Sequence, residues 1–202
     1  MTDQAGGKDQ EGVMTVVEQA FPGNEAPPEL SVGIVSLVEL CQLAMPDPAA
    51  LAHAIENAGF GVGPQETADE VGAWLALDQR VFSFAVRNLR HRLWGRERHE
   101  APVMLLLSEG ESDEGPVVFV STLFSGAAEA DAIKAAAHVS NKQPLNGAQA
   151  VNKQGAKLRR VFWDVGGVDH IRGLLVSGPQ NVDSFTGMRA ITAFNLVSKR
   201  TA

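Results

Sequence analysis

Arginines crowd one stretch of this sequence, and their spacing could support the binding of an anion. The stretch holds Arg87, Arg90, Arg92, Arg96 and Arg98, with His91, Trp94 and His99 between them. A guanidinium is always charged, and its planar fork of N–H donors matches the oxygens of a phosphate or a carboxylate. The ring of Trp94 could stack on a nucleotide base. The segment therefore predicts a surface for nucleic acid, or for a phosphorylated or carboxylated small molecule.

A second basic interval lies between Asp131 and Asp164, with no acidic residue inside it. Its basic residues are Lys134, Lys142, Lys153, Lys157, Arg159 and Arg160. Clusters of this kind bind phosphate backbones by releasing counterions. Across the two segments, the residues that we assign as candidate anion ligands are Arg87, Arg90, Arg92, Arg96, Lys153, Arg159 and Arg160.

Ser125 is a further candidate anion ligand, because with Gly126 it precedes a predicted helix. The free N–H groups at a helix N-terminus point toward an anion, and the helix dipole favours negative charge there. Simple capping by Ser125 is the alternative. For the basic segments, the alternative is a solvated face that opposes the acidic loop 109–114, since the chain as a whole has a net charge of −7.

Other residues that could do chemistry fit structural roles better. Asp164, Asp169 and His170 flank the pair Gly166-Gly167 and could hold a divalent ion or form an acid–base pair, but aspartate is also ordinary at turns. The single cysteine, Cys41, falls on the apolar side of a predicted helix, where a thiol acts as a small hydrophobe. The sequence contains no P-loop, Gly-x-Ser-x-Gly or His-Glu-x-x-His spacing. We therefore expect no catalytic residue, cofactor or metal.

Composition predicts one globular domain behind an acidic tail. The chain has 202 residues, of which 45% are hydrophobic and 20% charged, close to the averages of soluble domains. Acidic residues and prolines are concentrated in residues 1–30, which we expect to be a flexible tail before a domain at 31–202. The N-terminus lacks a basic start followed by an apolar stretch, and no apolar run is long enough to cross a bilayer. We expect a cytoplasmic location and no membrane contact.

The helices and strands that would position these residues are predicted from the spacing of apolar residues and from capping residues, glycines and prolines. Two helices are predicted first, at 32–45 after Ser31 and at 48–58, where Asp47 and Pro48 suit a helix start and Gly59 suits a stop. Residues 61–72 are expected to be a loop. Residues 74–94 fit either a strand or a helix, and we favour a strand at 80–87.

The second half of the chain predicts mostly strands. Residues 103–108 and 117–123 form an expected antiparallel hairpin across a polar connection, and a helix is expected at 128–139. A polar connection at 141–156 then leads to strands at 158–165, 170–176 and 188–197. The order predicts an α+β fold, with an antiparallel sheet of about five to six strands and helices packed on one face.

One part of the chain resembles a known group of proteins. The helix at 128–139, followed by Asn141, Asn146, Gly155 and a strand that begins at Leu158, is similar to the YbjN-like and type III secretion-chaperone-like group. The likeness covers residues 48–165. It implies a small α+β fold that forms homodimers and binds other proteins without catalytic residues. The chain departs from the group at its end, where strands are predicted instead of a final helix.

Two functions from different classes follow from the sequence. The first is a non-catalytic, cytoplasmic protein-binding or regulatory module that self-associates. The alternative is an anion-dependent function through the basic segments, either nucleic-acid binding or an enzyme that acts on a phosphorylated or carboxylated substrate. Salt dependence separates them, because binding driven by phosphate contacts weakens steeply with salt.

Overall fold

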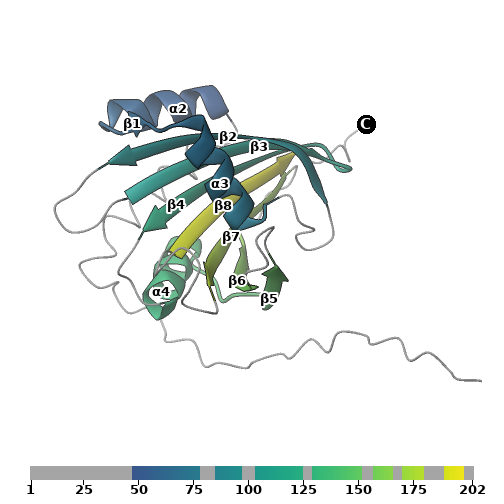
Figure 1. Cartoon of the computed structure of the whole chain (residues 1–202). Coiled ribbons are helices and arrows are strands. Elements are labelled where there is room, and N and C mark those ends of the chain that lie inside the picture. The colour runs from purple at the N-terminus through teal and green to yellow at the C-terminus, as the bar shows by residue number, and fades with distance from the viewer. Residues whose placement is uncertain are drawn as a thin grey trace, which may run out of the picture.

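One antiparallel sheet organises the chain. The computed structural model describes residues 47–77, 85–96, 103–124, 129–151, 157–165, 170–179 and 189–197. In chain order its elements are α2 (Pro48–Asn57), β1 (Gly61–Val62), α3 (Gln65–Leu75), β2 (Val86–Arg96), β3 (Val103–Ser112), β4 (Pro116–Phe124), α4 (Glu129–Ser140), β5 (Asn146–Val151), β6 (Lys157–Asp164), β7 (His170–Pro179) and β8 (Arg189–Val197). The eight strands pair in the order β1-β2-β3-β4-β8-β7-β6-β5, as Figure 1 shows. The predicted α+β class and antiparallel sheet are confirmed.

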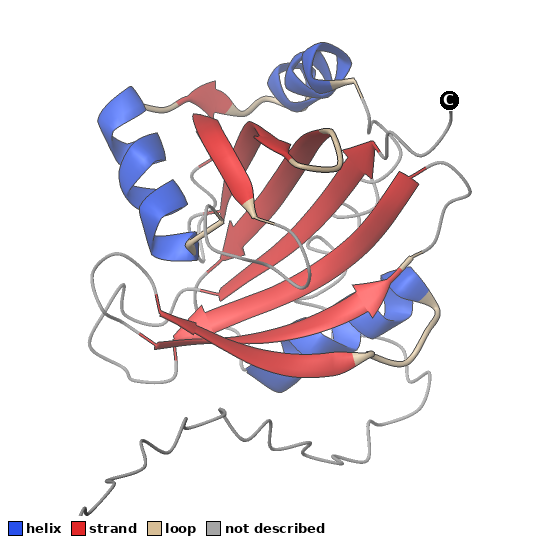
Figure 2. Ribbon diagram, turned by 90° about the vertical axis from the view of Figure 1, so that its right-hand side faces the viewer, coloured by secondary structure: helices blue, strands red, loops and turns tan. Residues whose placement is uncertain are grey.

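Helices cover both faces of this sheet, so the prediction of helices on one face is wrong. Leu51 and Ile55 of α2 and Ala136 of α4 share one buried cluster with Trp94 and Leu105. We call this side the α2–α4 face. In Figure 2 the sheet is curved, and α4 lies behind its lower strands.

The opposite side, which we call the α3 face, has its own buried cluster. Val71 and Trp74 of α3 pack there with Leu93, Leu106 and Phe119. Adjacent residues of a strand point to opposite faces, so Leu93 and Trp94 on β2 belong to different clusters. The core is therefore split into two layers by the sheet.

The start of α2 confirms the capping prediction. The Asp47 carboxylate accepts hydrogen bonds from the backbone N–H groups of Ala49 and Ala50, at 2.9 and 3.2 Å. Pro48 occupies the first turn, where a missing N–H costs nothing. The helix stops before Gly59, whose φ of +83° lies in the left-handed region.

The predicted loop at 61–72 is wrong, because α3 begins directly after Pro64. Gly61 belongs to the short strand β1, and Gly63 and Pro64 connect that strand to the start of α3. Ala68, Val71, Trp74 and Leu75 recur at helical spacing and are buried. The helix is favourable because these four residues form one apolar side, which is buried against the α3 face of the sheet.

The strand count exceeds the expected five to six because β1 and β5 were not predicted. β5 has the sequence Asn-Gly-Ala-Gln-Ala-Val, which is poor in β-branched and aromatic residues. Residues 80–84 of the strand predicted at 80–87 lie outside the described residues. The described strand β2 begins at Val86 and carries the arginine-rich segment. The acidic connection also shortens, since β3 runs to Ser112 and β4 begins at Pro116. The Ser112 hydroxyl holds this turn by donating to the Gly115 carbonyl at 2.9 Å.

Several predictions fall outside the described residues. They are the tail at 1–30, the helix at 32–45 with Cys41, the residues Arg98 and His99, and the turn at Gly166-Gly167. Among the described residues, no helix is long and apolar enough to span a bilayer.

Candidate functional site

Four of the candidate arginines lie on β2, and a β-bulge brings them to one face. Residues 88 and 89 both oppose Gly110, between the pairs Arg87–Glu111 and Arg90–Glu109. Asn88 takes a φ of +56°, a left-handed conformation that asparagine tolerates better than most residues. The extra residue shifts the alternation of the strand by one. Arg87 therefore shares the α2–α4 face with Arg90, Arg92 and Arg96.

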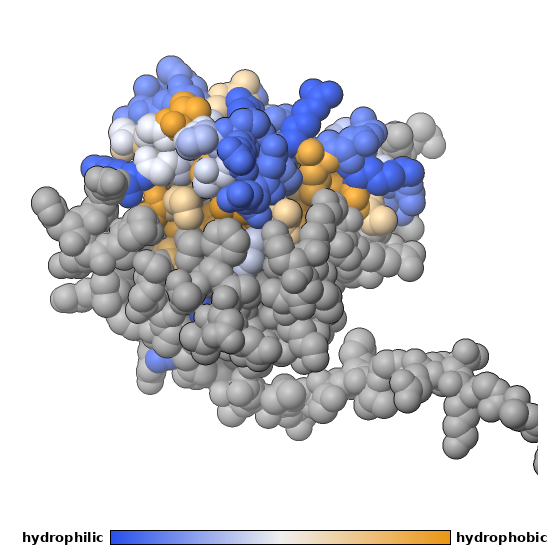
Figure 3. All heavy atoms as spheres, in the orientation of Figure 1, coloured by the Kyte–Doolittle hydropathy of each residue, from blue (hydrophilic) through white to orange (hydrophobic). Residues whose placement is uncertain are grey.

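These arginines are largely engaged by the protein itself. Arg87 pairs with Asp113 at 2.6 Å, and Arg92 pairs with Glu109 at 3.1 Å. Asn88 donates to Glu111 at 3.5 Å. The exposed surface of the β2–β3 hairpin therefore alternates positive and negative groups, and we call this set the hairpin surface: Arg87, Arg90, Arg92, Glu109, Glu111 and Asp113. Figure 3 shows hydrophilic residues on the right-hand side of the molecule, where β2 begins and β3 ends in Figure 1.

The other two arginines of β2, Arg96 and Arg90, lie in different environments. Arg96 donates to the carbonyl of Ala58 at 3.2 Å, past the end of α2, and its guanidinium lies 5.9 Å from the Phe60 ring centre. Arg90 is exposed, and within the described part of the chain it makes no hydrogen bond or ion pair. Of the four, Arg90 is therefore the one whose guanidinium has no partner among the described residues.

Trp94 is buried, so its predicted stacking on a nucleotide base is wrong. Its side chain is 1% exposed in the core of the α2–α4 face. Its indole N–H donates to the Glu56 carboxylate at 3.3 Å, and Arg92 lies over the ring at 5.7 Å. The tryptophan joins α2 to the sheet and leaves no free ring face for a ligand.

Arg160 is structural rather than part of an open anion site. It is 4% exposed, and its guanidinium donates to the carbonyls of Leu75 and Ala76, at 2.5 and 3.0 Å. The last carbonyls of a helix lack intrahelical partners, and the negative end of the helix dipole favours a cation there. Arg160 therefore caps α3 from β6.

The remaining sequence candidates do not assemble with the β2 arginines. Ser125 and Lys153 lie outside the described residues, and Arg159 is placed only through the backbone of β6. In the sheet, β2 and β6 are separated by β3, β4, β8 and β7. The two basic segments therefore do not adjoin within the sheet. Asp164 is exposed at the end of β6, and among the described residues no group of three or more acidic, histidine or cysteine side chains could hold a metal ion.

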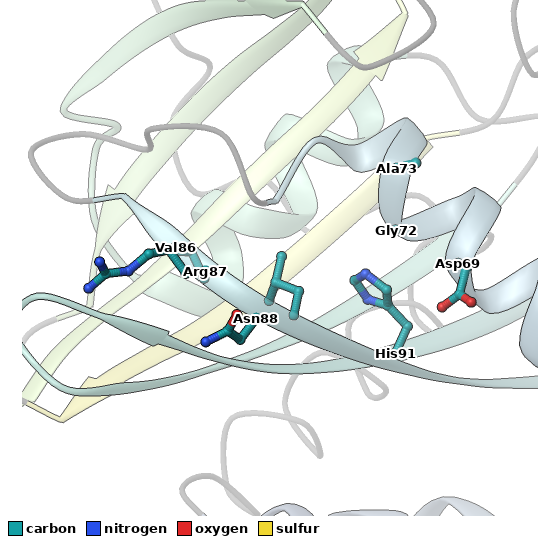
Figure 4. Close-up of a pocket in the computed structure, with 8 residues that line it drawn as sticks. Asp69, Gly72, Ala73, Val86, Arg87, Asn88 and His91 are labelled. Carbon is teal, nitrogen blue, oxygen red and sulfur yellow. The ribbon is translucent and has the colours of Figure 1, made fainter.

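A pocket of about 390 Å³ lies between α3 and β2, and the sequence reading missed it. Asp69, Gly72 and Ala73 of α3 line it, together with residues 86–89 and His91 of β2. Figure 4 shows Asp69 directed from the helix toward the strand and His91 directed from the strand toward the helix. The site was missed because α3 was expected to be a loop.

Its polar groups are held in place by their neighbours. His91 Nδ1 lies 2.8 Å from the hydroxyl of the fully buried Ser108. Gln65 donates both to Asp69 Oδ1, at 2.9 Å, and to the His91 carbonyl, at 3.1 Å. Gly72 lets the imidazole approach the helix, since a Cβ there would lie 2.4 Å from Nε2. The pocket is therefore lined by an imidazole held by a buried hydroxyl and by an exposed carboxylate that accepts a hydrogen bond from Gln65.

Comparisons with family models, with curated proteins and with solved structures find no match to this chain. The resemblance to the YbjN-like and secretion-chaperone-like group thus stays a prediction.

Proposed function

We propose that the chain is a non-catalytic protein-binding module whose first partner is a second copy of itself. The observation that carries the proposal is the difference between the two edges of the sheet. An edge strand leaves a row of N–H and C=O groups that can pair with a strand from another molecule. Among the described residues, one edge offers such a row and the other is blocked.

The open edge is β5. Within the described residues, β5 pairs with β6 alone. Its six residues include no charge and no proline, the features that usually keep edge strands from pairing. Leu145, directly before the strand, is 65% exposed. An apolar side chain beside an uncharged edge suits a protein partner.

The opposite edge is closed by several contacts. β1 has only two residues and covers Gly95 and Trp94. Next to it, Gly63 donates to the Leu93 carbonyl at 2.7 Å, and Gln65 donates to the His91 carbonyl at 3.1 Å. The bulge at residues 88 and 89 breaks the regularity of the rest of β2. Strand addition at this edge is therefore disfavoured.

The asymmetry of the edges favours a two-fold contact over a head-to-tail one. A head-to-tail contact would need both edges and would grow without closing, whereas an isologous contact uses one edge twice. Antiparallel pairing of β5 with itself is such a two-fold contact. With the axis at the centre of the strand, Asn146 lies opposite the partner's Val151, and no like charges meet.

The hairpin surface argues against the alternative, an anion-dependent function. A polyanion needs uncompensated positive charge, but Glu109 and Asp113 already bind two of the arginines. A surface of alternating sign suits a protein with complementary charges. The hairpin surface therefore supports protein binding over nucleic-acid binding.

Sedimentation equilibrium of the full chain tests the proposal, with a concentration-dependent dimer as the expected result. Backbone N–H groups alternate along a strand, so one of Ala148→Pro and Gln149→Pro removes an outward N–H and the other removes a bond to β6. The outward variant should keep its circular dichroism spectrum and become a monomer. Val62→Lys, at the closed edge and 72% exposed in the parent, is the control and should remain a dimer.

Two results would overturn the proposal of self-pairing. One is a chain that stays monomeric at every attainable concentration. The other is a pair of proline variants that both fold and dimerise as the parent does, because the contact would then lie elsewhere.

A further inference from the structure

The pocket between α3 and β2 combines one available carboxylate with three apolar residues. Val86 is 3% exposed, and Leu89 packs against the buried cluster of the α3 face. Ala73 adds a third apolar group from the helix. The volume of about 390 Å³ falls within the range of small-molecule sites. A volume of this size suits a compact organic ligand rather than a macromolecule.

The charge of the pocket favours a cation. The exposed carboxylate of Asp69 accepts a hydrogen bond at Oδ1 from the side-chain amide of Gln65, 2.9 Å away, and its second oxygen is left for a ligand. The other formal charge in the lining is Arg87, but its guanidinium is bound to Asp113 at 2.6 Å. Figure 4 shows the Arg87 side chain directed away from Asp69 and His91. An anion would therefore meet a carboxylate rather than a free guanidinium.

We infer that this pocket binds a small primary or secondary amine. The ammonium group donates to the Asp69 carboxylate, and a short apolar body lies against Val86, Leu89 and Ala73. The ring of His91, whose Nδ1 lies 2.8 Å from the Ser108 hydroxyl, borders the ligand. A hydrogen bond between an ammonium and a carboxylate is of the stronger, charge-assisted kind. This inference is independent of the pairing of β5.

Nuclear magnetic resonance titration of the full chain tests the inference with three matched probes. Phenethylamine, 2-phenylethanol and 3-phenylpropionate present similar apolar bodies with positive, neutral and negative ends. The amine should bind with a dissociation constant on the order of 1 mM, a normal value for so few atoms. It should shift the amide signals of residues 69–73 and 86–91. The alcohol and the acid should bind at least about tenfold more weakly.

Two substitutions and a control separate a specific site from general attraction to an acidic chain. Asp69→Asn should weaken amine binding by about tenfold or more. Glu70→Gln removes the same charge from the next residue of α3, outside the pocket lining, and should leave binding unchanged. Ala73→Leu should fill the pocket and abolish binding without unfolding the chain, as a circular dichroism spectrum would show.

The inference is overturned by any of three outcomes. The first is no binding of the amine, and the second is tighter binding of the acid than of the amine. The third is an equal effect of Asp69→Asn and Glu70→Gln, which would mean that the amine follows net charge and not the pocket.

Discussion

Arg160 on β6 donates a hydrogen bond of 2.5 Å to the backbone carbonyl of Leu75, at the last residue of α3. A second bond reaches Ala76 at 3.0 Å. These hydrogen bonds connect α3, which lines the pocket, to β6, the strand next to the edge strand β5. Arg160 is 4% exposed, so water cannot hydrogen-bond freely to its guanidinium. The buried charge and the helix carbonyls therefore each need the other as a hydrogen-bond partner.

Replacing this arginine should therefore destabilise the fold. Arg160→Met should lower the free energy of unfolding by about 3 kcal/mol, since it leaves buried helix carbonyls without a donor. Arg160→Lys keeps the charge but loses the planar fork, so we expect a smaller loss. Urea denaturation provides the measurement. Arg92→Met is the control on an exposed ion pair and should cost at most about 1 kcal/mol; an equal cost for both would contradict the capping role.

Gly72→Ala should destabilise the protein, although alanine normally favours a helix by about 1 kcal/mol over glycine. The reason is that the new Cβ would lie 2.4 Å from His91 Nε2, and overpacking of this kind typically costs about 1–3 kcal/mol. The double variant Gly72→Ala/His91→Ala should cost less than the sum of the single changes. Additive effects in thermal unfolding would show that the ring moves aside freely.

The β2 bulge predicts opposite effects at two neighbouring positions. Asn88→Gly should be neutral or slightly stabilising, because glycine adopts a φ of +56° without strain. Gly110→Ala should be destabilising, because a Cβ there would lie 2.9 Å from the Arg87 carbonyl oxygen. Unfolding in urea would reveal both effects, and a stabilising Gly110→Ala would argue against the bulge.

Removing the carboxylates of the hairpin surface should expose its arginines. The triple variant Glu109→Gln/Glu111→Gln/Asp113→Asn should lose little stability, about 0–1 kcal/mol for each exposed pair. It should gain affinity for single-stranded RNA at low salt, and this affinity should fall steeply as salt is raised. Fluorescence anisotropy with labelled RNA measures both. Equal RNA binding by the parent would restore the nucleic-acid alternative.

The sequence alone determined the elements whose signals are local. Asp47, Pro48 and Gly59 mark the start and end of α2 through capping and backbone preferences that act within a few residues. The β-rich runs of β3 and β4, and the alanine-rich α4, also appear where they were predicted. In each case neighbouring residues carry the stabilising interaction, so their order in the chain is enough.

Tertiary structure decided what depends on distant partners. β5 is a strand because β6 supplies its hydrogen bonds, not because of its own weak propensity. The arginine cluster predicted positive charge, but its pairing with Glu109 and Asp113 depends on strand register and on a bulge. Arg160 is buried because the end of α3 lies against β6. The sequence shows how many charged residues the chain has, whereas long-range packing determines which of them meet a partner and which face solvent.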